Sequence, residues 1–275
     1  VSSASIILPY LRKVTGNIVL NNTKASLLSF PALETVGGSV EIADNAKLLA
    51  LWMPSLTAAD GSLAITRNPQ LGASQPAGDA EHVISVDLPA LQRIGGDFTL
   101  ELNTQLKSLT LYKLQEVGRG LRIVSNTAMW QIVMTGLGSV GLACRNHDDF
   151  CGDLSIHNNS RLVGLFLPAL ATLQYDFRVS GNSALVTLQE RIKSVSGLYA
   201  QDNKSLCERM TLDPILSRMW KLGRFPDKVS IQRNSTQDGC ATRCPNESAG
   251  VCHILEDKTS HRSSTETRQP GDGVL

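Results

Sequence analysis

The chain has 275 residues, of which 42% are hydrophobic and 5% aromatic, and its formal net charge is +1. This balance excludes the strongly basic surface typical of proteins that bind nucleic acid or anionic membranes. No run approaches the roughly 20 apolar residues of a membrane span, so we expect no direct membrane insertion in this segment.

From the N-terminus onward, one unit of about 23 residues recurs. Each copy has two apolar residues spaced two apart, then an Asn, then two residues of leucine type. A degenerate copy begins at Gly16, and insertions separate some of the later copies. A solenoid tolerates such insertions because each coil contacts only its neighbours. The repeated Asn residues are Asn45, Asn68, Asn103, Asn126, Asn159, Asn182, Asn203 and Asn234.

Apolar residues at alternate positions, such as Val40 and Ile42, form the inward face of a short strand. Stacked copies of such a strand make a parallel sheet. The repeat therefore predicts a mainly β fold, a right-handed parallel β-helix or leucine-rich-repeat-like solenoid of about eight or nine coils. Two roles are open for the repeated Asn: an inward ladder that bonds the backbone of the next coil, or tolerance of a left-handed turn.

After Asn203 the repeat gives way to a segment with helical spacing. Thr211 or Asp213 can cap a helix near 211–222 that has Pro214 in its first turn. We expect this helix to close the solenoid, because an open end exposes core and unpaired strand edges. With the strand KVSIQ that follows, the solenoid domain spans 1–240. The apolar residues that share one helical face are Ile215, Leu216, Met219 and Trp220.

Cysteines and glycosylation sequons together indicate a secreted, extracellular protein. The six cysteines are even in number and clustered, and proximity predicts a disulfide between Cys144 and Cys151. Disulfides are favoured over a zinc site at Cys240 and Cys244, since no His pair is adjacent. The chain starts with neither Met nor a signal-like segment, so we expect a processed piece. The candidate glycosylation sites are Asn21, Asn158 and Asn246, whereas the sequons at Asn203 and Asn234 fall on the inward Asn positions.

The one dense polar cluster, at 145–153, contains His147, Asp148, Asp149 and Asp153. Such a cluster can hold a hard cation or supply an acid–base pair, but a solvated loop tied by the neighbouring cysteines is the preferred interpretation. No nucleotide, nucleophile or metal motif is present. The sequence therefore predicts no catalytic residue, no metal and no cofactor, with a carbohydrate-active β-helix enzyme as a remote alternative.

Two outward columns of side chains are the candidate ligand-binding surface. Exposed aromatic and mixed polar side chains on a flat sheet favour a protein contact. The alternative is that the insertions at 72–84 and 138–150 cover them. The first column contains Arg122, Ser155, Arg178 and Tyr199 with His157 beside it, and the second contains Trp52, Thr110, Val133 and Phe166.

The segments NKSLCERMTLDPILSRMW, KVSIQRN and GCATRCPNESAGVC resemble the closing part of the receptor L domain of the insulin and epidermal growth factor receptor families. The resemblance covers about residues 8–252 and extends to coils such as FPALETVGGSVEIADNAKLLAL. It implies disulfides Cys207–Cys240 and Cys244–Cys252, the start of a cysteine-rich segment at 241–252, and binding of peptide ligands on a sheet face. The coils are also similar to those of fungal cell-wall proteins with L-domain-like repeats.

These observations together predict an extracellular, non-enzymatic module that binds a protein or peptide ligand or a cell-surface partner, as a fragment of a receptor tyrosine kinase ectodomain. A glycosylated structural or adhesive cell-surface protein is the alternative. The tail at 253–275 has few apolar residues and much Ser, Thr and charge, so we expect it to be disordered.

Overall fold

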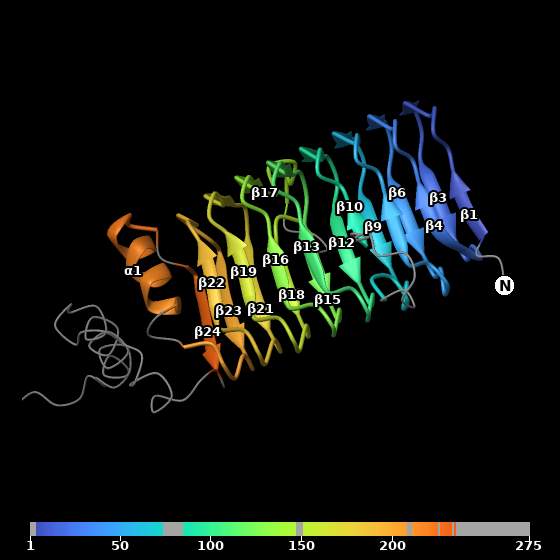
Figure 1. Ribbon diagram of the computed structural model, residues 1–275. Coiled ribbons are helices and arrows are strands. Elements are labelled where there is room, and N and C mark those ends of the chain that lie inside the picture. Colours follow the sequence, from blue (N-terminus) through green and yellow to red (C-terminus); the bar gives the residue numbers. More distant parts are fainter. Residues whose placement is uncertain are drawn as a thin grey trace, which may run out of the picture.

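The computed structural model describes residues 4–73, 85–146, 151–207, 211–224, 226–232 and 234. These residues form a mainly β structure in which all the strand pairs are parallel, with one helix at its C-terminal end. The strands are stacked in a row that runs from the N-terminus to α1 (Figure 1). The predicted cysteine-rich segment at 241–252 and the tail at 253–275 lie outside the described residues.

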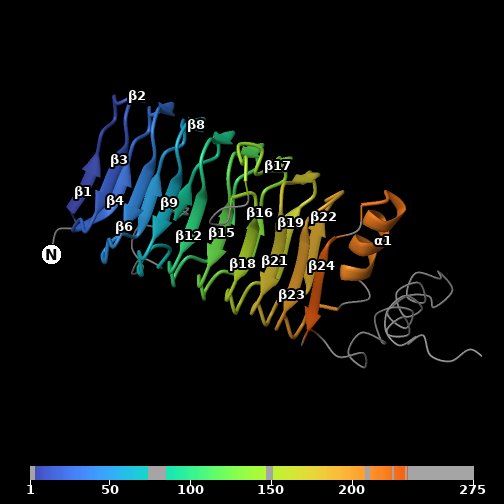
Figure 2. The same cartoon turned by 180° about the vertical axis from the view of Figure 1, so that it is seen from behind.

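The longest sheet contains one strand from each repeat unit, nine in all, and we call it the long sheet. It faces the viewer in Figure 2. Each pair joins consecutive units, so the sheet grows by one strand per unit along the chain. Its strands are β3 (Ile18–Asn21), β6 (Val40–Ala43), β9 (Leu63–Thr66), β12 (Phe98–Glu101), β15 (Leu121–Val124), β18 (Leu154–His157), β21 (Asp176–Ser180), β23 (Gly197–Gln201) and β24 (Lys228–Gln232).

Three further sheets use the remaining strands of the same units. A seven-stranded sheet consists of two-residue strands: β2 (Lys13–Val14), β5 (Thr35–Val36), β8 (Ala58–Ala59), β11 (Arg93–Ile94), β14 (Glu116–Val117), β17 (Ser139–Val140) and β20 (Thr172–Leu173). Two four-stranded sheets share the remaining face, the first with β1 (Ala4–Ile7), β4 (Ala25–Ser29), β7 (Ala50–Trp52) and β10 (Val86–Asp87), and the second with β13 (Ser108–Thr110), β16 (Gln131–Val133), β19 (Gly164–Leu167) and β22 (Thr187–Glu190).

The core is a set of in-register aliphatic stacks enclosed by these sheets. In the long sheet, Leu100 pairs with Ile65 on one side and Ile123 on the other, and Ile156 pairs with Val179. All of these side chains are fully or almost fully buried. The predicted alternation is therefore confirmed, since one inward residue per unit repeats at the same height in every strand.

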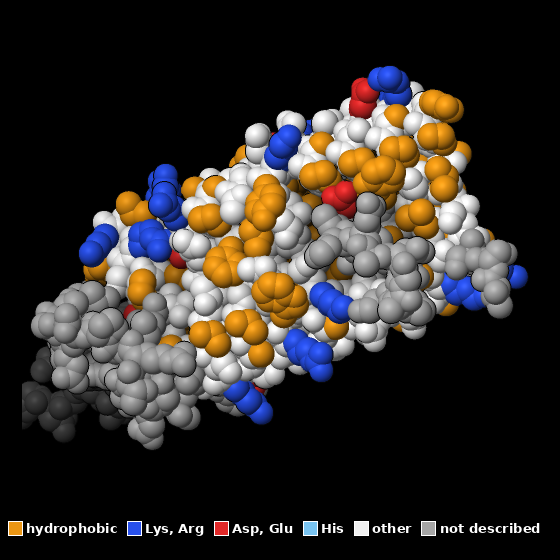
Figure 3. All heavy atoms as spheres, viewed as in Figure 1, with side chains coloured by type: hydrophobic (Ala, Val, Ile, Leu, Met, Phe, Trp, Pro, Cys, Tyr) orange, Lys and Arg blue, Asp and Glu red, His pale blue; other side chains and the backbone are white. Residues whose placement is uncertain are grey.

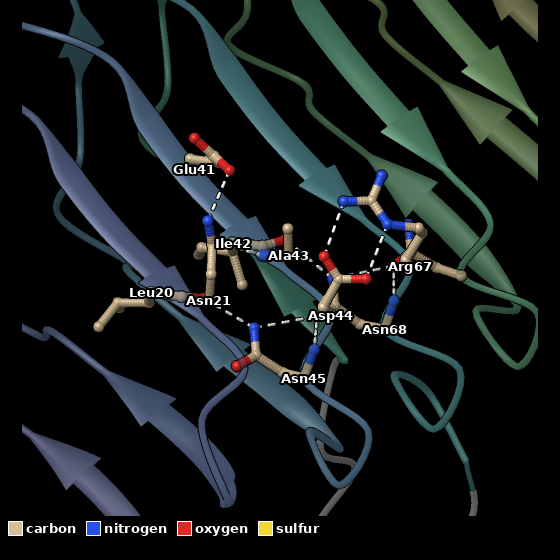
Figure 4. A network of polar contacts seen from close by, with 10 residues as sticks. Leu20, Asn21, Glu41, Ile42, Ala43, Asp44, Asn45, Arg67 and Asn68 are labelled. Carbon is tan, nitrogen blue, oxygen red and sulfur yellow. Dashed lines mark hydrogen bonds and ion pairs between the residues drawn. The ribbon is translucent and has the colours of Figure 1, made fainter.

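The repeated Asn side chains form the predicted inward ladder. Asn126 is fully buried, and its Oδ1 accepts from the backbone N–H of Asn103 at 3.0 Å, while its Nδ2 donates to the carbonyl oxygen of Leu100 at 2.9 Å. The same two bonds recur from Asn45 to Asn234, and Figure 4 shows those around Asn45 and Asn68. Each Asn thus pairs backbone groups of neighbouring units that burial would otherwise leave without partners.

The left-handed turn belongs to the residue before the ladder Asn, in every unit from Asn45 to Asn203. Asp44, Leu102 and Ser125 have φ values of 58°, 57° and 55°, and Gly181 occupies the same position with φ 66°. The alternative role for Asn therefore applies to the neighbouring position. This assignment also explains why Asn22 is out of step in the degenerate first unit. Asn22 occupies the left-handed position (φ 57°), and Thr23 occupies the ladder position, where its backbone N–H donates to Oδ1 of Asn45.

Helix α1 (Asp213–Lys221) confirms the predicted cap, and strand β24 follows it as expected. Ile215, Leu216 and Met219 are buried, with Pro214 in the first turn. The prediction of the capping residue was wrong. The N-cap residue is Leu212, which makes no side-chain cap hydrogen bond. Trp220 is 47% exposed, because the helix buries a stripe narrower than the full apolar face. Within the described chain, no helix has the length and apolar character needed to cross a membrane.

Glycines allow close approach between the backbones of neighbouring units. A Cβ on Gly118 would lie 2.1 Å from the carbonyl oxygen of Gly95, whereas one on Gly138 would meet nothing closer than 3.7 Å. We therefore expect Gly118→Ala to lower the free energy of unfolding by about 1–3 kcal/mol, because a backbone atom cannot move aside cheaply. Gly138→Ala should be neutral or slightly stabilising. Urea denaturation of the two variants tests this difference, and equal stabilities would contradict it.

Candidate ligand-binding face

The first predicted column lies on the outward face of the long sheet, in register across four strands. Arg122 pairs with Ser155, Ser155 with Arg178, and Arg178 with Tyr199. His157 lies two residues beyond Ser155 on β18. Ser155 is buried, whereas the other members of the surface are half-buried and accessible: Arg122, His157, Arg178 and Tyr199.

Arg178 is the centre of the column and is held by three neighbours. Its Nε lies 3.4 Å from Oδ2 of Asp153, and its Nη2 donates to Oδ2 of Asp176. Its guanidinium carbon lies 4.6 Å from the centroid of the Tyr199 ring, which is a cation–π geometry. The ring in turn lies over Gly197, where a Cβ would come within 2.5 Å of it. Arg178 and Tyr199 are thereby fixed before any partner binds.

The neighbouring column consists of Val124, His157, Ser180 and Gln201, again in register. His157 Nδ1 is hydrogen-bonded to the Ser180 hydroxyl. Burial lowers the pKa of His157, and the positive charges of Arg122 and Arg178 lower the pKa further. The imidazole is therefore neutral at pH 7. The hydroxyl of Ser155 is only 1% exposed and has no hydrogen-bond partner among the described residues.

A second polar ladder at the start of these strands was missed by the sequence reasoning. Side-chain oxygens of Asn17, Ser39, Ser62, Asp97 and Asp153 each accept a hydrogen bond from the backbone N–H of the equivalent residue in the next unit. The signal was present in the sequence, since each of these residues directly follows a glycine at the same position of its unit, two residues before the outward position of the strand.

Asp153 corrects the interpretation of the 145–153 cluster as a solvated loop. It is 2% exposed, accepts from the backbone of Asp176 at 3.0 Å and pairs with Arg178. The reason is its register, which places it in the second ladder. His147, Asp148 and Asp149 lie outside the described residues. In the part of the chain that the structure describes, no group of three His, Cys, Asp or Glu side chains is placed to hold a metal.

The second predicted column is divided between the two four-stranded sheets. Trp52 is on β7 and is 43% exposed, whereas Thr110, Val133 and Phe166 are half-buried and in register on β13, β16 and β19. The prediction missed Trp130, which is 49% exposed. Trp130, Val163 and Val186 occupy the same position, four residues after the ladder Asn, and hydrophobic side chains gather over these sheets in Figure 3.

Cysteines and sequons are placed as follows. Cys144 and Cys151 form a disulfide. Cys207 is disulfide-bonded, but Cys240, Cys244 and Cys252 lie outside the described residues, as does Asn246. Asn21 and Asn158 are exposed, whereas Asn203 and Asn234 are buried in the ladder with their side-chain amides hydrogen-bonded.

The geometry of the long sheet thus brings together Arg122, Ser155, His157, Arg178 and Tyr199, and leaves the second column on other sheets. Searches of protein-family models, of curated proteins and of solved structures find no match to this chain.

Proposed function

We propose that the chain is an extracellular, non-enzymatic recognition module that binds a protein or peptide on the outward face of the long sheet. In this proposal the parallel stack is a right-handed β-solenoid of about nine coils, of the receptor L-domain type, and the chain is a fragment of a receptor tyrosine kinase ectodomain. The observation that carries the proposal is the in-register column of Arg122, Ser155, Arg178 and Tyr199. The Cys144–Cys151 disulfide is compatible with an oxidising compartment.

Two properties of this column support binding. Tyr and Arg are enriched at the centres of protein interfaces, where they contribute most of the binding energy. Arg178 and Tyr199 are also held in place by Asp153, Asp176 and Gly197, so little side-chain entropy is lost when a partner binds. A prearranged surface of this kind suits recognition.

The state of the carboxylates on this face supports a role without catalysis. Asp153 and Asp176 are the paired acids that a glycoside hydrolase would need. Both are buried, and both form ion pairs with Arg178. In this arrangement both carboxylates hold Arg178 in position.

One observation favours the second candidate function, a glycosylated structural or adhesive cell-surface protein. The sequon residues Asn21 and Asn158 are exposed at the ends of β3 and β18, at the same edge of the long sheet. Glycans there would line one edge of the stack and leave the Arg178 column open. The two functions therefore differ in whether the column has a partner.

Peptide selection tests the proposed function. The full 275-residue chain is panned against a phage-displayed library of random peptides, and affinities of the selected peptides are measured for two variants. We expect Tyr199→Ala to weaken binding about tenfold or more, as for a residue at the centre of an interface. Tyr112→Ala is the matched control, because Tyr112 is exposed and lies away from the long sheet, between β13 and β14. Its affinities should stay within about twofold of the wild type.

Two results would contradict the proposal. Either no peptide is enriched over an unrelated protein, or the enriched peptides bind the Tyr199 and Tyr112 variants equally well. The first result would favour the structural role, and the second would move the binding surface to another face.

A further inference from the structure

A cavity lies at the C-terminal end of the stack, between helix α1 and the segment that follows β22. Its volume is about 610 Å³, and it is an open hollow that is accessible from solvent. Four of the six residues that line it are cations, and Figure 3 shows Lys and Arg side chains gathered over α1 and the adjacent end of the sheets. The lining residues are Glu190, Arg191, Lys193, Arg218, Lys221 and Leu222.

The single acid in this cavity is already neutralised. Arg218 Nη1 donates to both carboxylate oxygens of Glu190, at 2.9 and 3.1 Å, and the Glu190 side chain is 2% exposed. Arg191, Lys193 and Lys221 are exposed and form no ion pair with any described residue. The cavity therefore has a surplus of three positive charges.

This surplus differs from the pattern on the sheet faces. There, arginines pair with acids of the neighbouring unit, as in Arg93–Glu116 and Arg122–Glu101. A helix dipole accounts for Lys221, which is in the last turn of α1. It does not account for Arg191 and Lys193, which come from the connection after β22. Like charges that share a cavity repel each other, so an anion bound among them would be stabilised.

We propose that this cavity binds an anionic ligand that carries several phosphate or sulfate groups. Guanidinium and ammonium groups form charge-assisted hydrogen bonds with the oxygens of such groups. Three cations that have no ion-pair partner among the described residues suit more than one phosphate or sulfate group. Leu222 and the aliphatic stems of the lysines provide apolar contact for a carbon skeleton. The site is separate from the Arg178 column and does not depend on the function proposed for that column.

Calorimetric titration at about 0.15 M ionic strength tests this proposal, because weaker, distant charge effects are largely screened there. The probes are inositol hexakisphosphate and a heparin-derived hexasaccharide, with myo-inositol and maltohexaose as uncharged counterparts. The site variant is Arg191→Met/Lys193→Met/Lys221→Met in the full chain. The matched control removes the same net charge from exposed lysines elsewhere, as Lys24→Met/Lys47→Met/Lys113→Met. A second site variant, Arg191→Met/Lys193→Met, leaves α1 unchanged.

We expect at least one anionic probe to bind, the site variants to weaken its binding about tenfold or more, and the control to stay within about threefold of the wild type. If only the phosphate probe binds, the ligand is phosphorylated, and if only the hexasaccharide binds, the ligand is sulfated. If both bind, the site recognises the oxyanion chemistry that phosphate and sulfate groups share. The proposal is overturned if neither probe binds, or if site and control variants weaken binding equally. Peptide binding through Tyr199 should be unchanged in the site variants.

Discussion

Asn126→Ala is expected to lower the free energy of unfolding by about 3 kcal/mol, since it leaves one buried backbone N–H without an acceptor, at a cost of about 1–3 kcal/mol, and also removes a buried hydrogen bond to a carbonyl oxygen. The backbone N–H of Asn103 loses its acceptor, and the carbonyl oxygen of Leu100 loses the hydrogen bond from Asn126 Nδ2 but keeps its place in the sheet ladder. Both groups are enclosed between neighbouring strands, where the alanine methyl group offers no replacement. Chemical denaturation of the full chain measures the loss.

Thr23→Ala is the matched control for this prediction, because Thr23 occupies the ladder position in the first unit. Its hydroxyl donates to Oδ1 of Asn45 at 2.7 Å, but the backbone N–H of Thr23 keeps its own bond to that oxygen after the change. No backbone group is orphaned, so we expect a loss of about 1 kcal/mol. An Asn126→Ala variant that is no less stable than Thr23→Ala would show that the ladder is not a main source of stability.

Much of this structure could be predicted because a repeat places equivalent residues in equivalent surroundings. The inward aliphatic stacks and the Asn ladder follow from one unit of sequence, and parallel pairing then repeats them along the chain. The same reasoning placed Arg122, Arg178 and Tyr199 in one column. The repeat alone was thus sufficient to place the residues that recur in every unit.

The contacts within the column were harder to predict. Arg178 is held by Asp153 and Asp176, which come from the position two residues earlier in two successive units. These acids lie outside the outward column of central strand residues, so that column gave no sign of the second polar ladder. Long side chains reach diagonally across a sheet, and the sequence period does not fix which of several neighbours they bind.

The C-terminal end could be predicted only in outline. The sequence indicated an amphipathic helix, but not how much of its apolar face is buried. Helix α1 covers only the small open end of the core, so Ile215, Leu216 and Met219 are buried and Trp220 stays exposed. The Glu190–Arg218 pair joins a strand end to a helix across 28 positions with no repeat to set their register. Residues outside the period meet through tertiary packing, for which the sequence pattern contains no signal.

The Glu190–Arg218 pair provides the second large expected effect. Arg218→Met should destabilise the chain by about 2–3 kcal/mol at pH 7, less than for a fully buried ion pair, because Glu190 is buried but the Arg218 side chain is 35% exposed. The Glu190 carboxylate would then stay buried without its counter-charge and without the two bonds from Nη1. Lys221 lies on the same helix and forms no ion pair with any described residue. Lys221→Met should therefore change the free energy of unfolding by less than about 0.5 kcal/mol.

The pH dependence of this loss has a definite sign. Burial already raises the pKa of Glu190 in the folded chain, and Arg218 opposes that rise. A carboxyl group whose pKa is raised on folding contributes stability below its unfolded pKa, and this stability is lost as the pH rises through the folded pKa. Removing Arg218 raises the folded pKa of Glu190 further, so the variant's deficit should shrink as the pH falls from 7 toward the ordinary Glu value.

Denaturation of wild type, Arg218→Met and Glu190→Gln/Arg218→Met at neutral and acidic pH measures this dependence. The double variant has no charge at residue 190, so it should recover most of the stability that Arg218→Met loses at pH 7, and residue 190 should add nothing to the pH dependence of its own stability. Hydrogen exchange in α1 should follow the same order, because the pair fixes the helix to the end of β22. A deficit of Arg218→Met that is the same at both pH values would mean that Glu190 is not a charged partner of Arg218 in the folded chain.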